Sequence, residues 1–326
     1  MEATTQSSIY TYKRDNLIKE GDLVFVYESA DSIKQITMKR GAIYNNKFGQ
    51  FPHNDIIDQA EFGQKVYSKQ MKGWVYMLRP TSHAYTNSLA QRTQILYTPD
   101  ISQVLFRLEL KPGMRVVESG TGSGSLSTSI IRQILPQGHL FTYEFNAVRA
   151  EKAREDFEGK LGFKGLVTVT HRDVLSNGFL LKDEESDTIL VSENSIDAVF
   201  LDLPRPQDAV EHAYKVLRKQ GRLCNFSPCI EQVQKAVEQM AQVGFYEIRT
   251  FETLSRDYIT SHLTFESINK KPEDDADSVV KETGAGAGAG AGGRRQQKQR
   301  EKGMVAELPR ADIRGHTGYL TFAIKF

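Results

Sequence analysis

A glycine-rich stretch that follows a short apolar run is the feature that most constrains this chain. Residues 115–119 read RVVES, and glycines follow at positions 120, 122 and 124. Glycine has no Cβ, so such a loop lets backbone N–H groups approach a ligand closely. The spacing acid-x-G-x-G-x-G departs from the G-x-G-x-x-G of dinucleotide-binding folds, because Ser125 stands where the last glycine would be. The stretch therefore predicts another kind of nucleotide-cofactor loop, placed between a strand and a helix.

The loop lies within a regular alternation of apolar runs and amphipathic segments. The apolar runs predict strands at 115–119, 139–145, 166–173, 195–204 and 221–228. Helices are predicted between them at 125–135, 147–161 and 208–219, and a further helix and strand follow over 230–254. The closing run GYLTFAIKF predicts a last strand that returns to the sheet. This pattern is typical of an open α/β sheet.

The remaining segments predict the domain organisation. Residues 1–16 are expected to form a flexible tail, and residues 17–85 read as short strands broken by turns, which predicts a small β-barrel or meander. The α/β domain is assigned to 86–269 and 312–326. Between these two pieces, residues 270–311 combine an acidic run, a Gly-Ala repeat and a basic run, so we expect a disordered low-complexity insertion.

Composition narrows the functional classes. Among 326 residues, 42 Lys and Arg nearly balance 41 Asp and Glu, so no global basic field marks a nucleic-acid binder. The two cysteines, Cys224 and Cys229, provide neither a disulfide framework nor a four-ligand zinc set, and no metal is expected. The first residues lack the apolar core of a signal peptide, and no apolar run approaches the length of a membrane span. We therefore expect no membrane association.

The glycine spacing resembles the S-adenosylmethionine loop of class I methyltransferases, and acids at the predicted strand ends fit that frame. Glu118 ends the first strand, and Glu144 ends the second, where a carboxylate accepts hydrogen bonds from ribose hydroxyls. Asp173 follows the third strand, where an acid reads the adenine amino group and Val174 would pack on the ring. Each acid alone also fits a solvated strand end. Together they lie at the carboxyl edge, where open α/β sheets bind ligands.

Asp202 ends the fourth predicted strand in the sequence DLPRP. Methyltransferases that modify exocyclic amines usually add an aromatic residue to such a motif, and none is present here. A carboxylate without an aromatic platform suits a ring nitrogen, because it orients the base through the neighbouring amino group and stabilises the cation that methylation produces. The alternative is a turn stiffened by Pro204, without a catalytic role.

Several segments extend the resemblance to one family. ESGTGSGS, RAEKARE, KGWVYMLRP, QRTQILYTPD, FSPCIEQVQ and GHTGYLTFA together resemble the catalytic subunit of eukaryotic tRNA adenine-58 N1-methyltransferases. The resemblance covers roughly residues 17–265 and 313–326. It implies a class I fold, with a seven-stranded, mostly parallel sheet whose last strand runs antiparallel between the fifth and the sixth.

The resemblance also implies an activity and partners. The expected reaction transfers a methyl group from S-adenosylmethionine to N1 of adenine 58 in the tRNA T-loop, with T-loop-like mRNA sites as a further substrate class. The expected partners are tRNA and a non-catalytic subunit of related fold, in a nuclear heterotetramer with two copies of each subunit. The balanced charge agrees with this expectation, because a partner subunit can supply phosphate contacts. The basic run from Arg294 to Lys302 fits a nuclear signal, a tRNA tether or a solvated linker end.

The resemblance assigns two sets of residues. Asp202 is the expected catalytic carboxylate, and the cofactor contacts, together with the loop glycines, are Leu96, Gly120, Gly122, Ser123, Gly124, Ser125, Glu144, Arg149, Asp173, Val174 and Asp202. The implied substrate contacts are Gly73, Trp74, Gln94, Tyr97, Leu203, Pro204, Phe226, Ser227, Pro228, His316 and Thr317. The target base must be extruded from the folded T-loop, and Tyr97 and Phe226 are candidates to stack on it unless they pack in the core.

Two other functions remain open on the sequence. Cys229 follows the fifth predicted strand, where RNA 5-methylcytosine methyltransferases place a nucleophilic thiol, although a small residue at a helix start is the favoured interpretation. The chain also fits a catalytically inactive, RNA-binding scaffold with a methyltransferase fold. The intact glycines and strand-end acids favour an enzyme.

Overall fold

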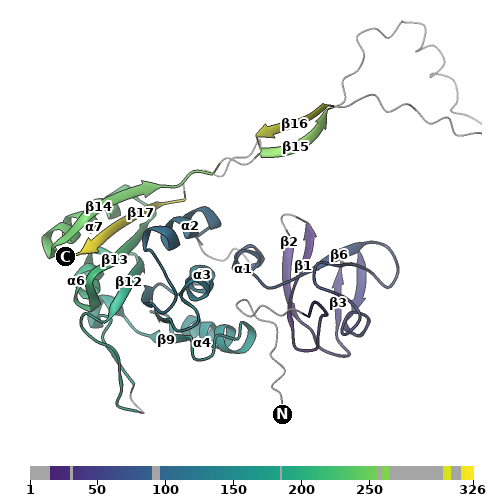
Figure 1. Cartoon of the computed structure of the whole chain (residues 1–326), viewed down its shortest axis with the longest axis horizontal. Helices are drawn as coiled ribbons and strands as arrows, with labels where there is room; N and C mark the ends of the chain where they lie inside the picture. Colours follow the sequence, from purple (N-terminus) through teal and green to yellow (C-terminus); the bar gives the residue numbers. More distant parts are fainter. Residues whose placement is uncertain are drawn as a thin grey trace, which may run out of the picture. The chain divides into compact units, whose positions relative to one another are not determined.

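The computed structural model describes residues 15–29, 32–89, 96–183, 186–255, 258–263, 304–309 and 317–326. These residues belong to two compact units (Figure 1). One unit comprises Met1–Thr253 with His316–Phe326, and the other comprises Leu254–Gly315. The first unit carries both the N-terminal strands and the glycine loop.

The N-terminal strands form an antiparallel β domain, as the sequence predicts. Its main sheet has the order β2-β1-β6-β5, with β1 at Leu23–Ser29, β2 at Ser32–Thr37, β5 at Lys65–Tyr67 and β6 at Trp74–Leu78. A separate hairpin joins β3 (Ile43–Asn46) to β4 (Gly49–Pro52), and the short helix η1 (His53–Asp55) follows. Alternate residues of the strands, including Val24, Val26, Val75 and Met77, face a core of their own.

The predicted central sheet is confirmed, with seven strands in the order β14-β17-β13-β12-β7-β8-β9 (Figure 1). Their bounds are β7 Arg115–Ser119, β8 His139–Glu144, β9 Val167–His171, β12 Ile196–Asp202, β13 Leu217–Ser227, β14 Phe245–Glu252 and β17 Tyr319–Lys325. The strands from β13 to β9 pair in parallel, whereas β17 is antiparallel to both of its neighbours, β13 and β14. The end of the chain therefore completes the sheet between its fifth and sixth strands.

Helices cover both faces of this sheet. They are α2 (Thr98–Arg107), α3 (Ser125–Ile134), α4 (Ala147–Glu155), α5 (Val174–Asn177), α6 (Gln207–Val216) and α7 (Ile230–Val243). Figure 1 shows α3 and α4 on one side of β12 and β13, with α6 and α7 on the other. Neighbouring strand residues face different cores, so Val116 packs with α3 and Val117 packs with α6 and α7. The strands are apolar on both faces because both faces are covered.

Some boundaries differ from the prediction. The helix predicted to reach 219 ends at Val216, because β13 already begins at Leu217. The helix predicted over 147–161 changes at Asp156 into the π-helix η2 (Asp156–Lys160). A hairpin of β10 (Leu181–Lys182) and β11 (Ile189–Val191) occupies the segment between α5 and β12.

The second unit contains an antiparallel pair, β15 (Tyr258–Leu263) and β16 (Met304–Pro309). β16 lies within the insertion 270–311, for which the sequence predicts disorder; the prediction is wrong for these six residues, because the run MVAELP supplies apolar, β-branched character that the Gly-Ala repeat lacks. Residues 264–303 and 310–316 lie outside the described part of the chain. Within the described part, no helix has the length and apolar character needed to cross a membrane.

Candidate functional site

The loop between β7 and α3 requires glycine for steric reasons at two positions. Gly120 has φ +92°, and a Cβ added there would lie 2.3 Å from the carbonyl oxygen of Asp202. Gly124 has φ +77° at the N-cap of α3, where an added Cβ would lie 2.6 Å from the ring of Phe157. The positive φ values favour glycine as well. The loop therefore packs directly against the end of β12, where Asp202 lies.

Glu144 connects the end of β8 to this loop. Its side chain is 3% exposed, and its Oε2 accepts a hydrogen bond from the backbone N–H of Gly122 at 3.2 Å. Its Oε1 accepts from Arg149 Nε at 3.0 Å and from Arg149 Nη2 at 2.6 Å. Glu144, Arg149 and Gly122 are thus brought together at the carboxyl edge, as the predicted ribose-binding position requires.

Asp173 lies beyond β9 and caps α5. Its Oδ1 accepts from the N–H of Leu175 at 3.0 Å, and its Oδ2 accepts from Ser176 Oγ at 2.9 Å. Val174, the first residue of α5, is buried. Both carboxylate oxygens of Asp173 therefore have local partners, and contact with an adenine amino group would use their remaining lone pairs.

Phe145 is a candidate residue that the sequence analysis missed. It follows Glu144 directly, its side chain is 71% exposed, and it lines a depression together with His171, Arg172, Asp173, Asn177 and Leu180. An exposed aromatic face beside the predicted ribose acceptor suits a purine ring. The sequence pattern that could have identified Phe145 is an aromatic residue directly after the acid that ends a strand.

Asp202 is the last residue of β12 and is exposed to solvent. The surrounding protein raises the pKa of its carboxyl to about 6, chiefly by desolvation and then by the nearby charge of Glu144. Water still reaches the side chain and moderates both effects. The backbone beyond it is held in place, because Gln232 Nε2 donates to the carbonyl of Pro204 at 3.0 Å. Asp202 is ionised at neutral pH and ready to accept a hydrogen bond.

Glu118 lies beneath the loop and is 1% exposed. Its Oε2 accepts from Ser127 Oγ at 2.6 Å and from Thr142 Oγ1 at 2.8 Å. Burial is the largest effect on this carboxyl and raises its pKa to about 7; the charge of Asp202 acts in the same direction, while the two hydroxyl groups oppose the shift. Glu118 is the buried acid that joins β7 to α3 and β8 just before the loop.

We expect the raised pKa of Glu118 to make folding stability fall between pH 4.5 and about 7. The folded state binds this proton more tightly than the unfolded state, so its stabilisation is present at low pH and is lost as pH rises through the folded pKa, by about 3 kcal/mol at most. Glu118→Gln keeps acceptors for both hydroxyl groups and does not titrate. In urea unfolding, the stability of Glu118→Gln relative to the wild type should increase from pH 5 to pH 8, and an unchanged difference would contradict the assignment.

The other predicted cofactor residues lie on or beside the loop. Leu96 is buried, and its carbonyl accepts from Ser125 Oγ at 3.3 Å. The carbonyl of Ser123 accepts from Tyr85 Oη at 3.0 Å. Tyr97 follows Leu96 as the half-buried N-cap of α2. Gln94 lies outside the described residues.

The predicted substrate residues occupy two separate places. Trp74, beside Gly73 in the N-terminal β domain, is 40% exposed, and Lys65 Nζ lies 4.0 Å from the centre of its ring. Beyond the sheet edge, Leu203 is half-buried, Pro204 and Pro228 are exposed, and Ser227 is buried. Thr317 Oγ1 donates to Asp100 Oδ2 at 3.0 Å, whereas His316 lies outside the described residues.

Phe226 packs in the core. It is 4% exposed, and the neighbouring Gly318 approaches so closely that an added Cβ would lie 2.3 Å from its ring. In this conformation its ring has no free face for a base, so stacking by Phe226 would require the chain around Gly318 to move. The proposed stacking role stays a prediction.

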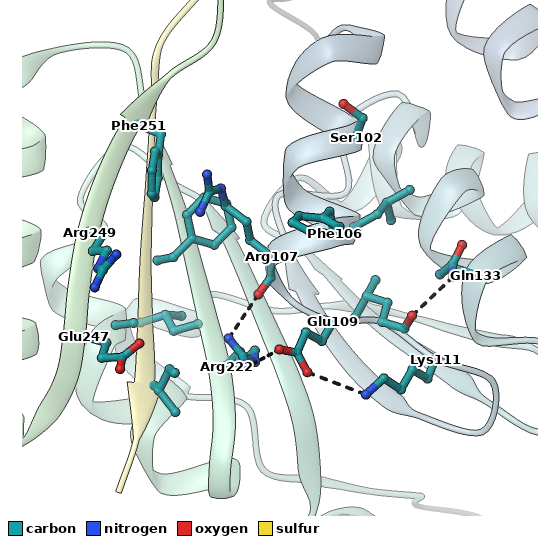
Figure 2. A pocket seen from close by; sticks show the side chains of 16 residues that line it. Ser102, Phe106, Arg107, Glu109, Lys111, Gln133, Arg222, Glu247, Arg249 and Phe251 are labelled. Atoms are coloured by element: carbon teal, nitrogen blue, oxygen red, sulfur yellow. Dashed lines mark hydrogen bonds and ion pairs between the residues drawn. The ribbon is translucent and has the colours of Figure 1, made fainter.

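A second pocket lies away from the strand-end acids, on the face of β13, β17 and β14 beside α2 (Figure 2). Figure 2 shows Arg222 between the carbonyl of Arg107 and the carboxylate of Glu109, which also pairs with Lys111. The labelled Phe106 is 77% exposed. This pocket contains none of the residues that the sequence assigns to the cofactor.

The site at the carboxyl edge fits S-adenosylmethionine. The loop is open at Gly122, where an added Cβ would have only the carbonyl oxygen of Gly120 near it, at 3.9 Å. Glu144 would supply acceptors for ribose hydroxyls, and Phe145 would supply an apolar face for the adenine. Among the described residues, no three His, Cys, Asp or Glu side chains are grouped to bind a metal. The residues that would hold the cofactor are therefore those of the loop, Glu144, Phe145 and Asp173.

Comparison with known proteins agrees with this geometry. The family described as "tRNA methyltransferase complex GCD14 subunit" matches residues 73–325. The tRNA (adenine(58)-N(1))-methyltransferase catalytic subunit of Dictyostelium discoideum is 42% identical, over 95% of this chain and 97% of its own length. The corresponding catalytic subunit of Candida albicans is 34% identical, over 98% of each chain.

Two solved structures share the fold. A SAM-dependent O-methyltransferase from Thermotoga maritima aligns over 95% of both chains, with a TM-score of 0.70 and 24% identity. The tRNA (m1A58) methyltransferase TrmI from Aquifex aeolicus aligns over 95% of this chain and 99% of its own, with a TM-score of 0.65 and 20% identity. The structures show a class I methyltransferase fold, and the match over most of the sequence shows that the chain belongs to the GCD14 family of tRNA methyltransferase complex subunits.

Proposed function

We propose that this chain is the catalytic subunit of a tRNA (adenine-58-N1)-methyltransferase. The observation that carries the proposal is the close approach of Gly120 to the backbone of Asp202, which brings the residue that carries the proposed catalytic carboxylate to the loop that would hold the methyl donor. The names of its relatives in Dictyostelium and Candida support the same activity. The intact glycines and acids favour this activity over an inactive scaffold.

The residues at the carboxyl edge of the central sheet then have separate roles in the reaction. When bound, S-adenosylmethionine supplies an electrophilic methyl group for the ring nitrogen of adenine. Glu144 and Arg149 would bind the ribose of the cofactor, and the glycine loop would leave space for its remaining atoms. Asp202 would accept a hydrogen bond from the amino group beside N1 and stabilise the positive charge that the adenine gains. Its ionised form at neutral pH suits both tasks.

Membership of a tRNA methyltransferase complex means that the chain works with tRNA and a second subunit. We further propose a heterotetramer with two catalytic and two non-catalytic subunits, located in the nucleus. The balanced charge supports a partner that supplies phosphate contacts, and the basic run from Arg294 to Lys302 is a candidate nuclear signal.

Product analysis tests the proposed activity. Unmodified tRNA transcript is incubated with S-adenosylmethionine and the reconstituted complex, then digested to nucleosides and analysed by mass spectrometry. We expect 1-methyladenosine, and we expect none from a transcript in which guanine replaces adenine 58. Methylation of cytosine, or no methylation by a folded complex that contains both subunits, would overturn the proposal.

Replacing Cys229 tests the competing activity, methylation of cytosine. The thiol is exposed at the residue before α7, so it is accessible to a substrate. An N1-adenine mechanism forms no covalent bond to the enzyme, and we expect Cys229→Ala to retain activity within about threefold, because the substitution removes one small exposed group. A 5-methylcytosine enzyme would lose all activity in the same assay.

A further inference from the structure

Helix α1 (Ser82–Ser88) follows the N-terminal β domain in the chain, and three of its buried residues carry hydroxyl groups. Its N-cap, Thr81, accepts from the N–H of Ala84, which accounts for the start of the helix. Ser82, Tyr85 and Thr86 are all at most 6% exposed. Buried hydroxyl groups are costly unless they are hydrogen-bonded, so their partners indicate what the helix holds in place.

Tyr85 bonds to the cofactor loop itself. Its Oη donates to the carbonyl oxygen of Ser123 at 3.0 Å, and the N–H of the same peptide, on Gly124, donates to the carbonyl of Thr121 at 3.0 Å. Both polar atoms of this peptide group are therefore fixed. Burial raises the pKa of the Tyr85 phenol, which keeps it protonated and able to donate. A Cβ added at Gly124 would also lie 2.6 Å from the ring of Phe157, in the π-helix η2.

Thr86 bonds to the next part of the loop. Its Oγ1 lies 2.8 Å from Ser125 Oγ, and Ser125 Oγ donates to the carbonyl of Leu96 at 3.3 Å. Thr86 is therefore the donor in the first of these bonds, and the three residues form one chain of hydrogen bonds. Ser82 Oγ adds a bond to the carbonyl of Thr128 in α3, at 3.3 Å. Thr86 and Ser82 thus join α1 to the cofactor loop at Ser125 and to α3 at Thr128.

The opposite side of α1 packs on the N-terminal β domain. The helix contacts β1 and β2, and Ala84 and Tyr85 share one apolar core with Leu23 and Phe25 of β1 and with Ile130 of α3. The helix is thus held by the β domain on one side, while its hydroxyl groups hold the loop on the other.

From this arrangement we infer that Tyr85 and Thr86 are positioning residues, which hold residues 123–125 in the conformation that binds S-adenosylmethionine. The inference rests on the proposed function. Without the Tyr85 hydroxyl, the carbonyl of the half-buried Ser123 loses its donor, and the peptide is free to turn away from the conformation that α3 and Gly124 require. The effect should fall on cofactor binding rather than on tRNA binding or on the chemical step.

Three variants test the inference in the reconstituted complex of full-length subunits. Tyr85→Phe and Thr86→Val each remove one hydroxyl with little change in volume, and Thr86→Ser keeps the hydroxyl. We expect Tyr85→Phe and Thr86→Val to raise the Kd and KM for S-adenosylmethionine about fivefold to fiftyfold, as for a buried group left unsatisfied. The KM for tRNA and kcat should stay within about twofold, and Thr86→Ser should restore the affinity for S-adenosylmethionine.

Tyr143→Phe is the matched control. Tyr143 is also buried and also donates to a backbone carbonyl, that of Phe179, but its side chain lies in the core on the other face of the sheet. We expect Tyr143→Phe to lower the Tm as Tyr85→Phe does, without changing the Kd measured by calorimetry. Equal weakening by both variants, or unchanged affinity in Tyr85→Phe and Thr86→Val, would overturn the inference alone. Absence of binding by the wild-type complex would overturn the proposed function and the inference with it.

Discussion

Replacing Asp202 with alanine should lower the kcat for adenine methylation by about 10²- to 10⁴-fold, the range expected when a positioned acid–base or charge-stabilising group is lost. Asp202 is the last residue of β12, and its backbone lies against the cofactor loop at Gly120. Its removal leaves the adenine without an acceptor for its amino group and without a counter-charge for the product cation. Steady-state kinetics of the complex on tRNA measures the effect.

Two controls sharpen this prediction. Asp187→Ala removes a carboxylate from the exposed β10–β11 hairpin and should leave kcat unchanged. The wild type should lose kcat/KM as pH falls through about 6, because the protonated Asp202 no longer accepts a hydrogen bond or carries charge. Asp202→Asn should be slow at every pH and lack this dependence. Near-wild-type activity of Asp202→Ala would contradict the proposed role.

Gly120→Ala should weaken cofactor binding and lower activity together. The new Cβ would lie 2.3 Å from the carbonyl oxygen of Asp202, so either the loop or the end of β12 must shift. A shift of about 1 Å in either element displaces the cofactor site from the carboxylate, and such misplacement costs about 10²-fold in rate. Calorimetry with S-adenosylmethionine and the methylation assay measure the two losses separately.

Gly113→Ala is the matched control for backbone strain. Gly113 has φ +88°, close to the +92° of Gly120, but a Cβ added there would meet no atom within 4 Å. This substitution should cost about 1–2 kcal/mol of stability through the left-handed backbone alone and leave binding intact. If Gly113→Ala and Gly120→Ala weaken the binding of S-adenosylmethionine equally, backbone strain rather than the contact with Asp202 explains why position 120 requires glycine.

The sequence predicted the central sheet well because the two patterns that indicate it, the apolar runs and the glycine spacing, are each local in the chain. Apolar runs of strand length and the glycine spacing define β7, β8, β9, β12 and β13, and the closing run GYLTFAIKF predicted β17 despite the long insertion. Strand ends follow from the same runs, so Glu144, Asp173 and Asp202 could be placed at one edge. Their common edge is a consequence of parallel pairing.

Contacts between distant segments could not be predicted in this way. The bond from Tyr85 to Ser123 and the packing of Phe226 under Gly318 depend on how helices and strands meet in space. The capping role of Asp173 depends on a single turn of helix that periodicity does not show. The strand at Met304–Pro309 was missed because the composition of the surrounding insertion outweighed one short apolar run.

The position of the methyl group on tRNA is the most direct test of the central claim. A methyl group on N1 blocks the Watson–Crick edge of adenine, so reverse transcription of the product should stop at position 58. We predict a stop that requires S-adenosylmethionine and both subunits, and that disappears with Asp202→Ala. A methylated product without a stop at position 58 would contradict methylation at N1 of adenine 58. A stop that forms as fast with Asp202→Ala as with the wild type would contradict the role of Asp202.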